Sequence, residues 1–146
     1  MKESDYPGEL VFFSGIAGAV AALIKLLVHH VFMWVGLTSG FYSELNTTLI
    51  HGHHKPEGFI DMVFVEFGDM VIGALFGIFL IFWLKASRPR YHWGIGLGFG
   101  FVVWFFTLVF GNLTKIIKPE MTTTWSLFAH LLAMQTFGIL IVLATR

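Results

Sequence analysis

Long runs of apolar residues dominate the chain, and short polar segments separate them. Four runs are long enough to cross a bilayer: residues 10–35, 59–84, 93–113 and 125–144. A bilayer's hydrocarbon core is about 30 Å thick and needs about 20 apolar residues in a helix. Because backbone polar groups find no partners in lipid, helices are the expected form. The sequence therefore predicts an all-α fold, an integral membrane four-helix bundle with a single domain over residues 1–146.

Composition supports this class and excludes several others. The chain is 56% hydrophobic and only 12% charged, whereas soluble domains carry about 25% charged residues. The formal net charge is +0, so no overall field attracts nucleic acid, and we predict the lipid bilayer as the main partner. The absence of cysteine excludes disulfides, iron–sulfur clusters and cysteine-based zinc sites.

The distribution of lysine and arginine predicts the orientation in the membrane. The connection at residues 85–91 carries three basic residues, and Lys2 and Arg146 add two more on the same side. The other side carries three lysines, so we predict cytoplasmic N and C termini and outward-facing connections at 36–58 and 114–124. The segment before the first run is more acidic than basic, unlike that of a signal peptide, so this run is expected to remain as an anchor.

Small and ionisable residues share one stripe of the first predicted helix. Gly15, Gly18 and Ala22 recur at helical spacing, and Lys25 and His29 continue the same line. Small residues let a neighbouring helix backbone approach closely. We therefore expect Lys25 and His29 to point into the bundle.

The other three runs carry similar stripes, and each joins small residues to a polar group. In chain order the stripes are Glu66, Asp69, Gly73 and Gly77; Gly96, Gly100, Trp104, Thr107 and Gly111; and Ser126, His130, Ala133 and Phe137. All four helices are thus expected to bring a polar group to a packing face.

The ionisable groups are predicted to lie at similar depths in the outer half of the membrane. At about 1.5 Å per residue, Lys25 and Asp69 lie roughly 15 Å from the outer ends of their helices. His29, Glu66 and His130 lie roughly 10 Å from those ends. Charges in hydrocarbon are costly and usually mark a functional site. We expect Lys25 to pair with Asp69, and the two histidines to pair with Glu66.

The balance of charges suggests what such a cluster does. One lysine against two carboxylates leaves one negative charge if the histidines are neutral. A buried carboxylate without a counter-charge is protonated, binds a cation, or makes a histidine cationic. The leading hypothesis is therefore a membrane protein that binds or conducts protons or cations. Its predicted site residues are Lys25, His29, Glu66, Asp69, His130 and, at about 12 Å depth, Thr107.

Structural roles remain open for the same residues. The ion pair would then only fix the register of the helices, and the histidines would be polar contacts between them. A non-catalytic accessory subunit in a larger membrane complex would use such contacts. Transport of an ion would require a homo-oligomer, because the four helices of one chain enclose little room for a pathway.

Cofactors stay undetermined at this level. A bis-His haem between His29 and His130 is an alternative, although Lys25 and two carboxylates compete for that space. We do not predict an enzyme, since the chain carries no nucleophile elbow, phosphate loop or zinc-protease helix.

A second group of histidines lies in the first outer connection. His51, His53 and His54 are weak metal candidates, because imidazole is a good ligand for zinc, copper or nickel. Short histidine-rich tracts lack a defined geometry. A solvated loop that gains charge below about pH 6.5 is the simpler interpretation.

The chain resembles the small four-helix bacterial inner-membrane proteins of the YagU/YqhR type. The likeness lies in the glycine-spaced first helix that leads to Lys25, the glycine-rich stretch from Trp93 to Gly98, and the Phe128-Ala129-His130 segment of the last helix. The resemblance implies a multi-pass protein of the bacterial inner membrane and assigns no biochemical activity.

Overall fold

A computed structural model shows four long helices. It describes residues 7–38, 47–48, 52, 58–86, 92–115, 117 and 123–144. The helices are α1 (Pro7–Trp34), α3 (Phe59–Ala86), α4 (His92–Leu113) and α5 (Thr124–Ala144). Each is long and apolar enough to cross a membrane. The prediction of an all-α architecture with four membrane-length helices is confirmed, and every boundary falls within one helical turn of its predicted position.

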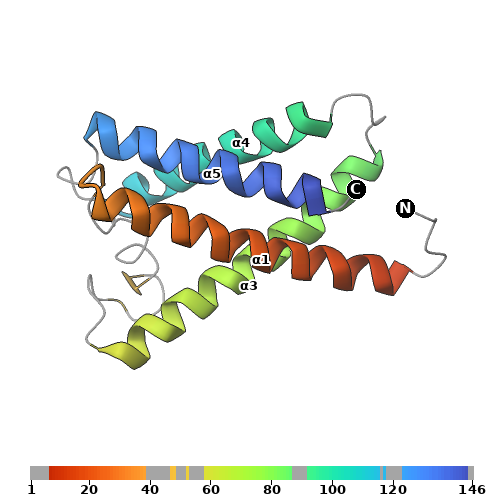
Figure 1. Cartoon of the computed structure of the whole chain (residues 1–146), viewed down its shortest axis with the longest axis horizontal. Coiled ribbons are helices and arrows are strands. Elements are labelled where there is room, and N and C mark those ends of the chain that lie inside the picture. Colours follow the sequence, from red (N-terminus) through yellow and green to blue (C-terminus); the bar gives the residue numbers. More distant parts are fainter. Residues whose placement is uncertain are drawn as a thin grey trace.

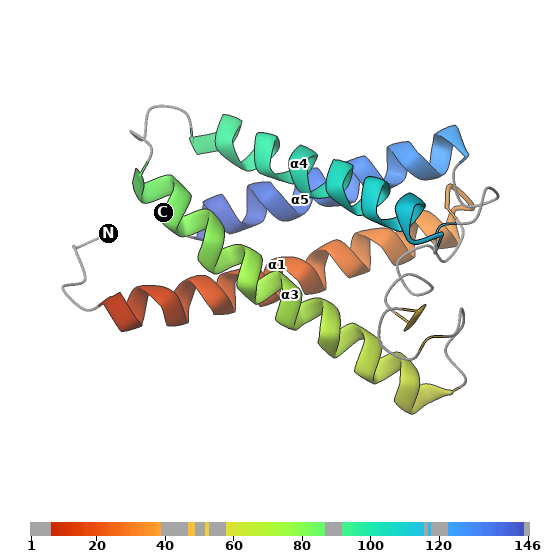
Figure 2. The same cartoon turned by 180° about the vertical axis from the view of Figure 1, so that it is seen from behind.

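The helices run alternately between the two ends of the molecule (Figures 1 and 2). The start of α1 and the end of α5 lie at one end, here called the terminal end. The end of α1 and the start of α5 lie at the opposite end, here called the distal end. The predicted orientation places the distal end outside the cell, and it stays a prediction from the charge distribution.

Local capping fixes two helix ends at the distal end. After α1, Gly36 takes a φ of 77°, and the amide of Leu37 donates to the carbonyl of Phe32 at 2.9 Å. These are features of a Schellman stop, in which glycine takes the left-handed position. Before α5, the Thr123 hydroxyl accepts from the Ser126 amide at 3.3 Å, as an N-cap does.

Two helix pairs form through contacts between backbones. In the first pair, α1 crosses α3 where Gly18 meets Gly73 and Gly77, and a Cβ at Gly77 would lie 2.8 Å from the Gly18 Cα. In the second pair, a Cβ at Gly96 would lie 2.9 Å from the Gly138 carbonyl oxygen. Neither contact leaves room for a side chain, so glycine is required for the helices to approach this closely.

An aromatic core joins the two pairs in the terminal half. The rings of Phe76, Phe99 and Phe137 come from α3, α4 and α5, with centroid distances of 5.8 to 6.5 Å. Leu80 and Ile141 are fully buried beside them. Such packed rings hold this half together by shape and dispersion.

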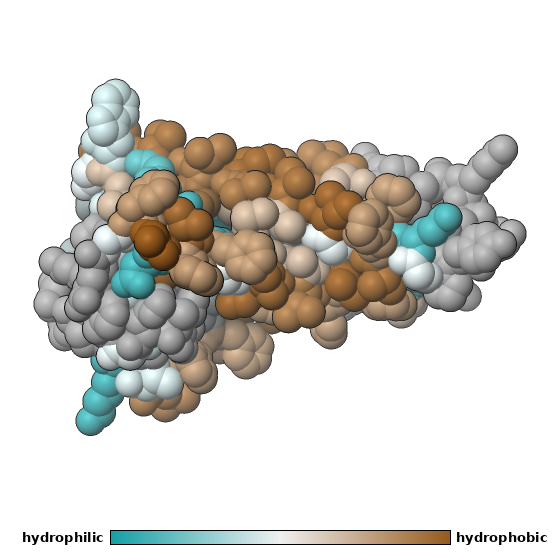
Figure 3. Space-filling view, turned by 90° about the horizontal axis from the view of Figure 1, so that it is seen from below, coloured by the Kyte–Doolittle hydropathy of each residue, from teal (hydrophilic) through white to brown (hydrophobic). Residues whose placement is uncertain are grey.

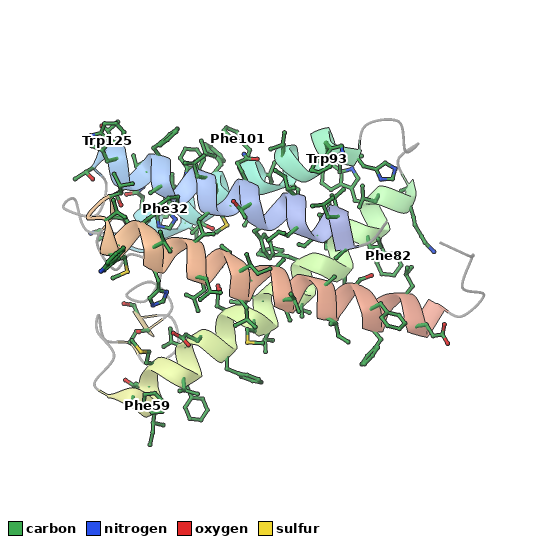
Figure 4. All side chains as sticks on the ribbon, in the orientation of Figure 1. Phe32, Phe59, Phe82, Trp93, Phe101 and Trp125 are labelled. Atoms are coloured by element: carbon green, nitrogen blue, oxygen red, sulfur yellow. The ribbon has the colours of Figure 1, made fainter. Side chains whose placement is uncertain are left out.

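The helices separate unequally toward the distal end. The start of α3, marked by the labelled Phe59, diverges from the other three helices, whereas α1 and α5 remain together (Figures 1 and 4). The labelled Trp93 and Trp125 lie at opposite ends of the bundle and are exposed (Figure 4). This placement matches that of interfacial aromatic residues.

The surface fits contact with lipid. Figure 3 shows a face that is apolar along most of its length, with hydrophilic residues toward the two ends. Many large apolar side chains on all four helices are exposed. Because a soluble protein rarely exposes so much contiguous apolar surface, the four helices indicate a multi-pass membrane protein in contact with a bilayer.

Candidate functional site

A buried ion pair joins α1 to α3 just beyond the glycine crossing. The Lys25 Nζ donates to the Asp69 Oδ1 at 2.8 Å and lies 2.7 Å from the Oδ2. Lys25 is 5% exposed and Asp69 is 8% exposed. Gly73, one turn along α3 from Asp69, lets α1 come close enough for this contact. The predicted pairing of Lys25 with Asp69 is confirmed.

Two histidines meet one turn farther toward the distal end. His29 follows Lys25 by four residues on α1 and packs against His130 of α5, with ring centroids 5.5 Å apart. The two residues are 1% and 2% exposed. The predicted stripe on each helix therefore points inward. The two imidazoles and the Lys25–Asp69 pair form one ionisable cluster shared by α1, α3 and α5.

The polar contacts continue from this cluster to the distal end along the boundary between α1 and α5. There the Thr38 and Ser126 hydroxyls are 3.0 Å apart, within hydrogen-bonding distance, and both residues are buried. At the other end of the line, the Lys25 Nζ lies 5.8 Å from the centroid of the Phe137 ring. We call this line the polar seam; its residues are Thr38, His29 and Lys25 on one side and Ser126 and His130 on the other, and it ends against Phe137 of the aromatic core.

Two predicted site residues have other contacts. Glu66 is half-buried on α3, one turn from Asp69, and forms no hydrogen bond or ion pair with any described residue. The Thr107 hydroxyl donates to the Val103 carbonyl of its own helix at 2.8 Å. The predicted pairing of Glu66 with the histidines is thus not seen in the described contacts. The Lys25–Asp69 pair is neutral by itself, which changes the charge balance expected from the sequence.

The possible cofactors can be compared with this geometry. The distance between the His29 and His130 rings is that of directly packed rings, which leaves no room for a haem macrocycle between them. In the described ranges, no group of three or more histidine, aspartate or glutamate side chains is placed to hold a metal. His51, His53 and His54 lie outside the described residues, so their proposed metal site stays a prediction.

Some site residues were not recognised from the sequence. Thr38 follows the first helix and belongs to no stripe, and Phe137 was assigned to packing although its ring faces the Lys25 ammonium. Outside the seam, Gln135 and Trp104 have a buried Oε1 and Nε1, respectively, without a hydrogen-bond partner among the described residues. Only the spacing of Ser126 and Phe137 from His130 could have indicated the seam, since contacts between α1 and α5 depend on the tertiary fold.

Comparison with protein-family models, with curated proteins and with solved structures gives no match. The resemblance to the YagU/YqhR type therefore stays a prediction from the sequence. Functional inference depends on the chain's own geometry.

Proposed function

We propose that this membrane protein binds protons or cations at the cluster of Lys25, Asp69, His29 and His130. The observation that carries the proposal is the ion pair with two packed imidazoles one turn away, all at least nine-tenths buried. Ionisable groups inside membrane spans are costly and mark ion or proton sites. Imidazole is the side chain that most readily changes protonation near neutral pH.

The charge of the cluster favours a proton as the ligand. Lys25 and Asp69 cancel each other, so the remaining groups with capacity for charge are the two histidine rings. A metal cation needs several ligands, and no group of three or more such side chains is placed to hold one in the described ranges, whereas a proton needs only one ring nitrogen. Asp69 is the acidic group close enough to offset the added charge, and the distal end supplies the proton by the predicted orientation.

The distribution of polar groups supports binding rather than passage through the bundle. Among the described buried polar residues, only Ser14 lies in the terminal half, and its hydroxyl donates to the Leu10 carbonyl of its own helix. The aromatic core occupies the rest of that half. A continuous path for ions would need polar partners there.

Proton uptake provides the first test. Purified protein in a weakly buffered solution is shifted from about pH 8 to about pH 3, a range that extends well below the titration of a solvent-exposed imidazole. We expect the wild type to take up more protons per chain than the His29→Gln/His130→Gln variant. A His30→Gln variant, which changes an exposed neighbouring histidine, controls for titration at the surface. Equal uptake by the wild type and the double variant would remove the proposal.

Flux separates conduction from binding. If protons or cations cross the protein, Asp69→Asn should abolish a pH- or cation-dependent flux in proteoliposomes, because it leaves Lys25 uncompensated. Asp61→Asn, a carboxylate near the start of the same helix, is the matched control. Glu66→Gln tests whether the second carboxylate takes part. Wild-type flux equal to that of empty vesicles would restrict the function to binding.

Glu66 favours a second candidate, a subunit of an oligomer or of a larger membrane complex. Its half-buried carboxylate has no hydrogen bond or ion pair with the described residues, and it belongs to the distal part of α3, the part of this helix that diverges from the others (Figure 2). A helix from another chain could donate hydrogen bonds to it. The mass of the purified protein in a native bilayer particle tests this candidate, and a monomer that still takes up protons would contradict it.

A further inference from the structure

The contact between α1 and α5 differs in kind along its length. Toward the terminal end it leads into the aromatic core around Phe137. Toward the distal end it consists of the polar seam, with the His29–His130 contact and the Thr38–Ser126 contact. Each flanking helix pair is held by glycine contacts of its own. The seam is therefore the boundary along which the two pairs can separate with least loss of packing.

Charges facing the histidines make that boundary sensitive to protons. His29 faces Lys25 and His30 on α1 and Asp69 on α3, and His130 faces His29 and Lys25. Helix α4 carries a single ionisable residue, His92, at the terminal end. A proton on each ring would place three positive charges beside one carboxylate. Like charges at this separation repel each other strongly where water is excluded.

We propose that the polar seam is a proton-operated gate, in which protonation of His29 and His130 parts α1 from α5 at the distal end. The α1/α3 and α4/α5 pairs move as units, and the aromatic core at the terminal end is the pivot. Opening admits water to the imidazolium groups and to the Lys25–Asp69 pair, which lowers the cost of their charge. This inference rests on the proposed proton site and adds the movement to which the site is coupled.

Distances between spin labels test the movement, and the absence of cysteine makes labelling specific. The distal pair is Trp34→Cys with Trp125→Cys, and the terminal pair is Phe13→Cys with Leu143→Cys. All four residues are exposed and each pair spans the α1/α5 boundary. From about pH 8 to about pH 3, which extends well below the titration of a solvent-exposed imidazole, we expect the distal distance to increase by more than about 2 Å, the scale of helix shifts in known switches. The terminal distance should stay constant.

The His29→Gln/His130→Gln variant should abolish the distal change. Its terminal distance reports whether the variant is folded, so a wild-type value there makes the loss interpretable. A second variant, Thr38→Cys/Ser126→Cys, places two thiols where the hydroxyl oxygens are 3.0 Å apart, close enough for a disulfide. Oxidation should slow proton uptake by the buried histidines, and reduction should restore it.

The outcomes distinguish the gate from the proton site. Histidine-dependent proton uptake with a constant distal distance would overturn the gate and leave the proton site intact. A pH-dependent change of the distal distance that persists in the double histidine variant would also overturn it. Equal proton uptake by the wild type and this variant would overturn both proposals.

Discussion

In the terminal half of the bundle, the helices meet through glycine backbones and packed phenylalanine rings, while in the distal half α1 and α5 meet through histidines and hydroxyls. The terminal contacts depend on shape and have no charge state to change. The distal contacts depend on hydrogen bonds and on the protonation of groups held away from water. One small bundle thus combines a half suited to rigidity with a half suited to a response.

The Lys25–Asp69 pair lies between the two halves of the bundle. It sits one turn beyond the glycine crossing of α1 and α3, which holds its partners at hydrogen-bonding distance. On its other side it borders Phe137. Substitutions on either side of this pair therefore test whether the stability of one half depends on the other.

The largest expected effect is that of truncating the central ring of the terminal half. Phe137→Ala should lower the free energy of unfolding by about 3–5 kcal/mol, because it leaves a cavity among rings from three helices. The exposed Phe101 provides the control, and Phe101→Ala should change stability little. Denaturation in mixed micelles, followed by tryptophan fluorescence, measures both variants. Equal losses would mean that the ring contacts do not form the stable half.

Breaking the buried ion pair should cost a similar amount of stability, but here a second substitution should restore most of the loss. Asp69→Leu leaves the Lys25 ammonium without its counter-charge, which costs about 3–5 kcal/mol. Adding Lys25→Met should restore most of that stability, since two apolar residues replace the pair. The same denaturation measurement is used, and proton uptake is compared in the double variant. A double variant no more stable than Asp69→Leu would contradict the assignment.

A single methyl group at the α1/α3 crossing should have an intermediate effect. Gly18→Ala places a Cβ against the Gly73 carbonyl and the Gly77 backbone, and overpacking of this kind costs about 1–3 kcal/mol. Gly98→Ala is the matched control, because nothing lies within 4 Å of its added Cβ. That control should keep or raise the thermal midpoint. A Gly18→Ala variant as stable as the control would show that the helix pair does not need close backbone contact.

The smallest expected effect is at the distal end of the seam. Ser126→Ala removes one interhelical hydrogen bond with Thr38, and such bonds in membranes are worth about 0.6 kcal/mol. The change should weaken only the distal half, so the distal spin-label distance should broaden while the terminal distance is unchanged. A broadened terminal distance would mean that the two halves do not separate as described.

The sequence by itself determined the four helices, because the length of each apolar run and the need to satisfy the backbone in lipid leave one solution. It also determined which stripe of each helix packs, since small residues at helical spacing mark close approach. The stripes alone predict that Lys25, His29, Asp69 and His130 lie in the interior.

Only the tertiary structure decided which of these groups meet. Asp69 and Glu66 have the same chemistry and lie one turn apart, yet the direction in which α3 crosses α1 brings only Asp69 to Lys25. Similarly, the packing of α5 on α1 rather than on α3 pairs His130 with His29. Periodicity assigns a side chain to a face of its own helix, whereas crossing angle and divergence set which faces come together.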